Sequence, residues 1–210
     1  TRILSTTDYG KMSIYSTWCS LLTLFVGLQV GGAIANAKVE YPEDEIPGFM
    51  SSIMTLALCS FSVFAVLTVI FCKPLSVFIN IRLDLVFLLL IQSFSSFCIG
   101  FYNGKLVQFK RADKSMYLSV TVSLLSTALS LVLVFTLPGE KYIAKIYGAA
   151  IPTVIIGLFL CVYVLARGKT FFRTDYWKFC LPLTLPLILH AAGHLILAQS
   201  DRIMIQKMVG

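Results

Sequence analysis

The chain has 210 residues, of which 58% are hydrophobic and 13% charged, and its mean hydropathy is +0.86. Soluble domains carry about 25% charged residues, so this composition excludes a soluble globular protein and requires a lipid-covered surface. The net charge is +7, and the lysines and arginines lie between the apolar stretches. This placement favours a role in membrane topology and in contacts with anionic lipid head groups over nucleic-acid binding.

Six stretches contain no Asp, Glu, Lys or Arg, and each is at least 20 residues long. A helix of about 20 residues crosses the ~30 Å hydrocarbon core, and in lipid a helix satisfies its own backbone hydrogen bonds. The sequence therefore predicts an all-α integral membrane protein with about six transmembrane helices. We expect them at 12–36, 50–72, 84–103, 116–137, 144–166 and 179–200.

Lysine and arginine are concentrated in two of the predicted loops. The loop after the third span holds Lys105, Lys110, Arg111 and Lys114, and the loop after the fifth holds Arg167, Lys169, Arg173 and Lys178. By the positive-inside rule we expect both loops to be cytoplasmic, in a multi-pass protein of the plasma (inner) membrane. The short link "LPGEKY" predicts that the fourth and fifth spans are antiparallel neighbours.

The sequence contains one internal echo. "ILSTTDYG" begins at Ile3 and "ILAQSDRI" at Ile196, with Ile, Leu and Asp at the same spacing. Six predicted spans separate the two copies, and an even number returns the chain to the same membrane face. Two parallel six-helix halves would produce this pattern. We expect Asp8 and Asp201 to hold the outer ends of the two first helices, with Arg202 as a partner charge.

This echo predicts a division into two lobes. Residues 1–166 would hold the first-lobe helices, 167–178 a cytoplasmic linker, and 179–210 the first helix of a second lobe. Residues 1–8 would be the end of a preceding helix. The chain lacks an initiator Met and neither end looks like a terminus, so we expect a fragment covering about helices 2–7.

Polar residues recur at helical spacing inside three spans. The third span carries Gln92, Ser96 and Asn103, and the fourth carries Ser123 and Ser126. The first span has a similar stripe, made of Ser13, Ser16, Ser20, Thr23, Gly27 and Gly31. Such stripes serve either close helix packing or the lining of a polar cavity. An amide in mid-membrane, as at Gln92, favours a functional role.

The sixth span combines prolines with histidines. Pro182 and Pro186 each remove a backbone hydrogen bond, which predicts a kinked helix. His190 and His194 lie at i and i+4 on one face. The pattern lacks the Glu of HExxH and an evident third ligand, which disfavours zinc. Proton transfer or sugar binding in a wet cavity remains open, as does a structural role.

Four segments resemble polysaccharide biosynthesis (O-antigen, Wzx-type) flippases of the multidrug/oligosaccharidyl-lipid/polysaccharide exporter superfamily: "TTDYGKMSIYSTW", "KVEYPEDEIPGFMSS", "YWKFCLPLTLPLILH" and "AQSDRIMIQKMVG". The resemblance implies a MATE-like two-lobe bundle around a central cavity. It implies flipping of oligosaccharide repeat units linked to polyprenyl pyrophosphate, from the inner to the outer leaflet. The implied partners are this glycan, membrane lipids and other polysaccharide assembly proteins.

The family is expected to hold cations in its cavity for the pyrophosphate, whereas these helix interiors are nearly free of Lys and Arg. Lys145 and Arg202 are the remaining candidates. We expect no enzymatic activity and no cofactor, because the sequence contains no GxSxG, P-loop or paired catalytic carboxylates. The alternatives are a cation-coupled multidrug exporter of the same fold, an integral-membrane glycan polymerase and a structural membrane subunit.

Overall fold

A computed structural model describes residues 6–79, 81–136 and 141–209, with side chains described over 7–197 of these ranges. Every regular element in them is a helix. In chain order they are α1 (Thr6–Val26), the short 3-10 helix η1 (Val30–Gly32), α2 (Ala33–Glu40), α3 (Ile46–Ile70), α4 (Cys72–Ile79), α5 (Leu83–Gln108), α6 (Ala112–Thr136), α7 (Lys141–Gly168) and α8 (Thr174–Val209).

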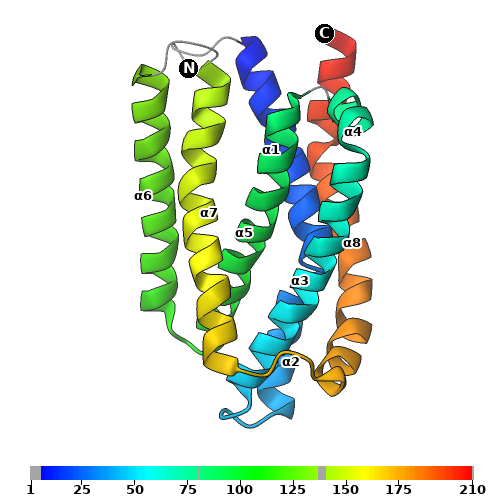
Figure 1. Ribbon diagram of the computed structural model, residues 1–210, viewed down its shortest axis with the longest axis vertical. Coiled ribbons are helices and arrows are strands. Elements are labelled where there is room, and N and C mark those ends of the chain that lie inside the picture. Colours follow the sequence, from blue (N-terminus) through cyan, green and yellow to red (C-terminus); the bar gives the residue numbers. More distant parts are fainter. Residues whose placement is uncertain (1–5, 80, 137–140, 210) are drawn as a thin grey trace.

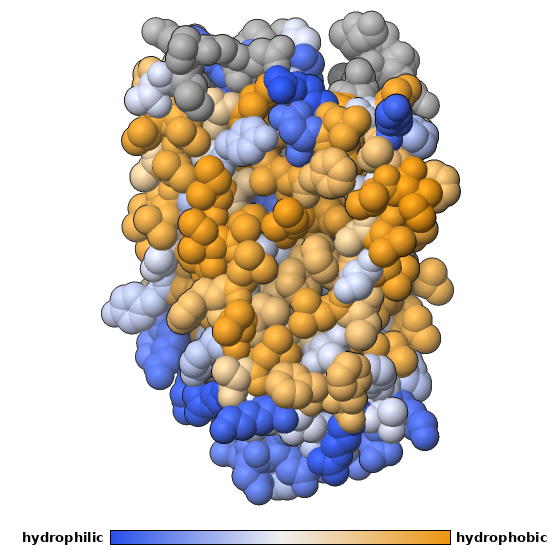
Figure 2. All heavy atoms as spheres, in the orientation of Figure 1, coloured by the Kyte–Doolittle hydropathy of each residue, from blue (hydrophilic) through white to orange (hydrophobic). Residues whose placement is uncertain are grey.

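The long helices run side by side along one axis, with α6 at one edge next to α7 (Figure 1). One end of the bundle holds α2, the α5–α6 loop and the α7–α8 connection; we call it the basic end. The start of α1, helix α4 and the last turns of α8 lie at the opposite end (Figure 1). Figure 2 shows a broad apolar band between hydrophilic surfaces, as a membrane-spanning bundle requires.

Five of the described helices are long and apolar enough to cross a membrane: α3, α5, α6, α7 and α8. A sixth span results if Thr7–Val26 and Val30–Glu40 are counted together, although the two are bent by 59°. The chain is therefore an all-α, multi-pass membrane protein, as predicted from its charge-free stretches.

The first span differs from the single helix predicted over 12–36, because it is broken after Val26. Leu28 and Gln29 both have φ of 49°, a left-handed conformation that is rare for residues other than glycine. The segment "GLQVGG" contains three glycines, which weaken a helix. A side chain at Gly27 would collide with the ring of Phe97, so α1 passes very close to α5 at the break.

The other spanning helices begin earlier than predicted. Helix α3 starts at Ile46, with Pro47 in its first turn, where a missing N–H costs little. Helix α8 starts at Thr174 and continues through both of its prolines. The connection expected at 167–178 therefore contracts to the non-helical residues 169–173.

Small residues bring the helices close together. Helices α6 and α7 pack against each other, which confirms the neighbours expected from the short link between them. Gly148 of α7 faces the backbone of Ser130 on α6, and Gly157 faces the backbone of Ser95 on α5. Such close approach adds van der Waals contact, which is what lipid-embedded helices rely on for association.

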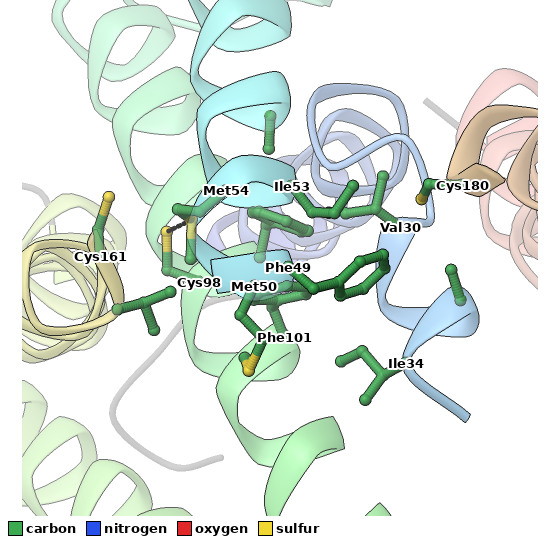
Figure 3. Packing of buried hydrophobic residues seen from close by; sticks show 14 of the residues in the cluster. Val30, Ile34, Phe49, Met50, Ile53, Met54, Cys98, Phe101, Cys161 and Cys180 are labelled. Atoms are coloured by element: carbon green, nitrogen blue, oxygen red, sulfur yellow. Dashed lines mark hydrogen bonds between the residues drawn. The ribbon is translucent and has the colours of Figure 1, made fainter. Parts of the chain in front are cut away.

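The larger apolar core lies toward the basic end and joins α1, η1, α2, α3, α5, α7 and α8. Figure 3 shows its centre, where Phe49 and Met54 of α3 meet Cys98 and Phe101 of α5. The Cys98 Sγ lies 3.8 Å from the Met54 Sδ. This packing fixes α3 against α5 and supports the helices that surround the cavities described next.

Candidate functional site

Two adjoining cavities lie between α1, α5 and their neighbours. The first has a volume of about 570 Å³ and is bounded by α1, the break, α5 and α8. The second has a volume of about 470 Å³ and is bounded by α1, α5 and α7. Ser20, Thr23 and Ser96 line both, so the two cavities adjoin along one half-open cleft whose wall mixes apolar surface with hydroxyl groups.

The first cavity receives both histidines of α8. His190 and His194 line it together with Gln29 from the helix break. Phe97 and Phe101 supply aromatic surface, while glycines on the break and on α5 leave room for a bound molecule. Its wall therefore combines imidazole, amide and hydroxyl groups with flat apolar faces.

The second cavity contains Gln92 and Lys145. The Tyr15 hydroxyl donates a hydrogen bond to the Gln92 Oε1 at 2.7 Å, which links α1 to α5 across the cavity. The Gln92 Nε2 has no protein partner among the described residues, so its hydrogens remain available to a ligand. Lys145 is the single Lys or Arg among the described lining residues of both cavities.

The hydroxyl groups of the lining are partly committed to the backbone. Ser20 donates to the Ser16 carbonyl at 3.0 Å, and Thr23 donates to the Cys19 carbonyl at 2.7 Å. Because each hydroxyl oxygen also accepts hydrogen bonds, these groups still offer acceptors to the cavity. Such local bonds satisfy the hydroxyl donors without a ligand.

Three of the predicted pathway residues are not among those lining the two cavities. Asn103 accepts a 2.6 Å hydrogen bond from Ser115, which ties the end of α5 to the start of α6. Ser126 donates to the Ala149 carbonyl of α7 at 3.4 Å. Ser123 is exposed on α6. The more buried serines of the α6 stripe, such as Ser126, thus contact α7.

The residues predicted to kink the sixth span or to hold helix ends have varied outcomes. Pro182 and Pro186 are exposed and do not line either cavity, although they lie in the helix that carries the histidines. Asp8 belongs to the first turn of α1 and not to a preceding helix, and its charge suits a helix N-terminus. The side chains of Asp201 and Arg202 lie outside the described residues.

Tyr15 and Gln29 are cavity residues that the sequence did not single out. Tyr15 reads as an ordinary aromatic beside the stripe of the first span. Gln29 lies between glycines, and in a continuous helix nothing would distinguish it from a packing residue. The presence of a polar amide within a glycine-rich segment was the one sequence feature that could have predicted a helix break within the membrane.

A network of polar side chains fixes the start of α8 at the basic end. The Tyr176 hydroxyl donates to the Glu45 Oε2 at 2.8 Å and accepts from the Arg173 Nη1 at 2.8 Å. The Trp177 Nε1 donates to the Ser52 carbonyl at 3.0 Å. These hydrogen bonds hold the start of α8 against α3, and so fix the position from which the cavity-lining part of α8 extends.

Aromatic rings surround this network. Tyr41 meets Tyr176 edge-on, with ring centroids 5.1 Å apart, and Phe179 at 5.4 Å. Burial, followed by the nearby carboxylate of Glu40, raises the pKa of the Tyr41 hydroxyl. Tyr41 therefore stays neutral at physiological pH and acts as a packing residue.

Among the described residues, no group of three or more His, Cys, Asp or Glu side chains is placed to hold a metal ion. The fold and the cavities define a multi-pass helical membrane protein with a half-open cleft that hydroxyl, amide and imidazole side chains line in part. The chain belongs to the polysaccharide biosynthesis protein family, whose family model matches residues 1–210. Its role therefore lies in polysaccharide biosynthesis. Comparisons with curated proteins and with solved structures gave no match.

Proposed function

We propose that this chain is part of a flippase that turns oligosaccharide repeat units, linked to polyprenyl pyrophosphate, from the inner to the outer leaflet. The observation that carries the proposal is the pair of cavities between transmembrane helices, each lined in part by polar side chains, in a chain of the polysaccharide biosynthesis family. Transport of this kind makes and breaks no covalent bond, so the proposed role is not enzymatic.

The physical task explains why polar side chains line the cavities. Moving one hydroxyl or amide from water into hydrocarbon without a hydrogen bond costs roughly 2–7 kcal/mol. A sugar carries several hydroxyls, so a glycan crosses only where protein groups replace water. Serine, threonine, glutamine and histidine side chains in the cavities supply donors and acceptors for this, while the prenyl tail stays in lipid.

The cavities also contain side chains suited to both parts of such a head group, the phosphate and the sugars. Lys145 supplies a positive charge that a phosphate would require. His190 and His194 line the other cavity and suit sugar hydroxyls, since a neutral imidazole donates from one nitrogen and accepts at the other. The broken first span adds support, because substrate sites in transporters are commonly built from discontinuous helices.

The test is export of surface polysaccharide by cells that carry the full-length protein with His190→Ala, His194→Ala or both as their sole copy. We expect at least one single variant to lose lipid-linked glycan translocation while it inserts at the normal level, and the double variant to lose it as well. Protein level in the membrane is measured in parallel so that export is compared per inserted molecule.

Leu189→Ala is the matched control, because Leu189 precedes His190, is 77% exposed and does not line the cavities. It should keep wild-type export. Wild-type export from the double histidine variant would refute the role of this cavity in glycan passage. Loss of export from Leu189→Ala to the same extent would show that any truncation in this part of α8 disables the protein.

A further inference from the structure

A second group of polar residues gathers at the basic end, away from both cavities. Tyr102 and Lys105 lie one turn apart near the end of α5, and Tyr163 and Arg167 lie one turn apart near the end of α7. Arg111 joins them from the α5–α6 loop. We call these five residues the cation cluster.

Direct contacts join three members of the cation cluster across two helices. The rings of Tyr102 and Tyr163 meet edge-on with centroids 5.8 Å apart, and the Arg167 Nη1 donates a hydrogen bond to the Tyr163 hydroxyl at 2.7 Å. Arg167 and Arg111 lie close enough to Lys105 for their charges to act on its half-buried ammonium group. Three positive charges therefore converge on one patch.

These cations lack a carboxylate partner in the described part of the chain. The two ion pairs found there join Arg82 to Asp84 and Arg173 to Glu45, and neither includes the cluster. Lys105 and Arg167 each lie in the last turn of a helix, and a helix C-terminus carries roughly half a negative charge. Two such ends supply about one negative charge against three positive ones, so the patch has an excess of positive charge that favours the binding of an anion.

We propose that the cation cluster binds the phosphate of an anionic phospholipid head group. Guanidinium and ammonium groups are the usual phosphate ligands, and tyrosine is enriched at the level of lipid head groups. Phe159 and Val162, about one turn closer to the middle of α7, are 68% and 65% exposed and give an acyl chain an apolar track. This track favours a lipid over free phosphate, and the site does not depend on the proposed function.

The experiment uses the purified full-length protein, delipidated in a neutral detergent and titrated with short-chain phosphatidylglycerol, short-chain phosphatidylcholine or inorganic phosphate. Native mass spectrometry counts the bound molecules. The wild type should bind one phosphatidylglycerol with preference over phosphatidylcholine. The K105Q/R111Q/R167Q variant should lose at least roughly tenfold in affinity, since each cation near the surface contributes attraction to anionic lipid.

The matched control is K114Q/K169Q/K178Q, which removes the same charge from the same end but outside the cluster. It should stay within about twofold of the wild type. An equal loss in both variants, or equal binding of phosphatidylcholine, would overturn the proposal. Binding of inorganic phosphate as tightly as phosphatidylglycerol would keep the anion site but overturn the lipid assignment.

A second measurement needs only the wild-type protein, in case the triple variant does not fold. A photoreactive phosphatidylglycerol is cross-linked to the protein in vesicles of phosphatidylcholine, and the labelled peptides are mapped. Cross-links should concentrate in residues 102–111 and 159–167. An even distribution over all loops of the basic end would overturn the proposal.

Discussion

The Gln92 side chain divides its hydrogen-bonding groups between the protein and the cavity. Its Oε1 accepts from the Tyr15 hydroxyl at 2.7 Å, which fixes the orientation of the amide, and the residue lines the same cavity as Ser96 and Lys145. An amide of this kind is costly in hydrocarbon. We therefore expect Gln92 to meet a polar molecule in the cavity.

This division separates the effects of two substitutions. We expect Gln92→Leu to lower glycan export by roughly tenfold or more, because about 1.4 kcal/mol of lost interaction with the passing head group suffices. Tyr15→Phe removes the orienting hydrogen bond alone, which in membrane proteins contributes ~0.6 kcal/mol, and should lower export by less than about threefold.

The measurement is export per inserted protein, with thermal unfolding in detergent recorded for both variants. If Tyr15→Phe abolishes export while Gln92→Leu leaves it intact, then the tyrosine is the functional group and Gln92 only its anchor. Equal and small effects of both would mean that the pair serves helix packing.

Among the elements, α7 has the closest contacts to its neighbours, through glycines. A Cβ at Gly157 would collide with the backbone of Ser95 on α5, and one at Gly148 with the backbone of Ser130 on α6. Backbone cannot move aside as a flexible side chain can. Helix α7 is thus held between α5 and α6 at separations that only glycine permits.

We expect Gly157→Ala to lower stability by ~1–3 kcal/mol, the usual cost of overpacking. Gly10→Ala is the control, because a Cβ at Gly10 meets no atom within 4 Å and alanine is the better helix former by ~1 kcal/mol. Thermal unfolding in detergent should therefore show a lower midpoint for Gly157→Ala and an equal or higher one for Gly10→Ala. A normal midpoint for Gly157→Ala would mean that α5 and α7 separate enough to admit a methyl group without loss of stability.

The elements also show what the sequence could and could not predict. Charge-free stretches located the spans, because length and hydropathy decide whether a helix enters lipid. The break at Leu28 and Gln29 was not predicted, because Gly27, Gly31 and Gly32 are equally compatible with a packing stripe. Backbone conformation there depends on contacts with α5 and α8, which are distant in the sequence.

The same reasoning applies to the candidate site. Period alone placed His190, His194, Gln92 and Ser96 on single faces of their helices, and those faces line the cavities. The helical spacing of polar residues could not show whether a face would meet a cavity or a neighbouring helix. The stripe that includes Ser126 therefore turned out to contact α7, although its pattern resembles that of a cavity wall.

At the scale of the whole molecule, the two ends of the bundle differ in charge. Three connections meet at the basic end, and two of them carry most of the loop lysines and arginines (Figure 1). Positively charged loops are retained in the cytoplasm during insertion. The two lysine- and arginine-rich loops thus lie at the same end of the bundle, as expected if successive loops lie on opposite sides of the membrane. Which side of the membrane each end faces is a prediction.

We predict that the basic end is cytoplasmic. Single cysteines at Gln108 and Thr170, in full-length protein without native cysteines, should resist an impermeant thiol reagent in intact cells and react after permeabilisation. A cysteine at Lys73, which is exposed at the opposite end, should react in intact cells and serves as the accessible control. Because charge bias alone sets the orientation here, reaction at Gln108 and Thr170 in intact cells, with protection at Lys73, would invert the topology. Under that result the cavities would have to load their glycan from the opposite leaflet, which contradicts the proposed direction of transport.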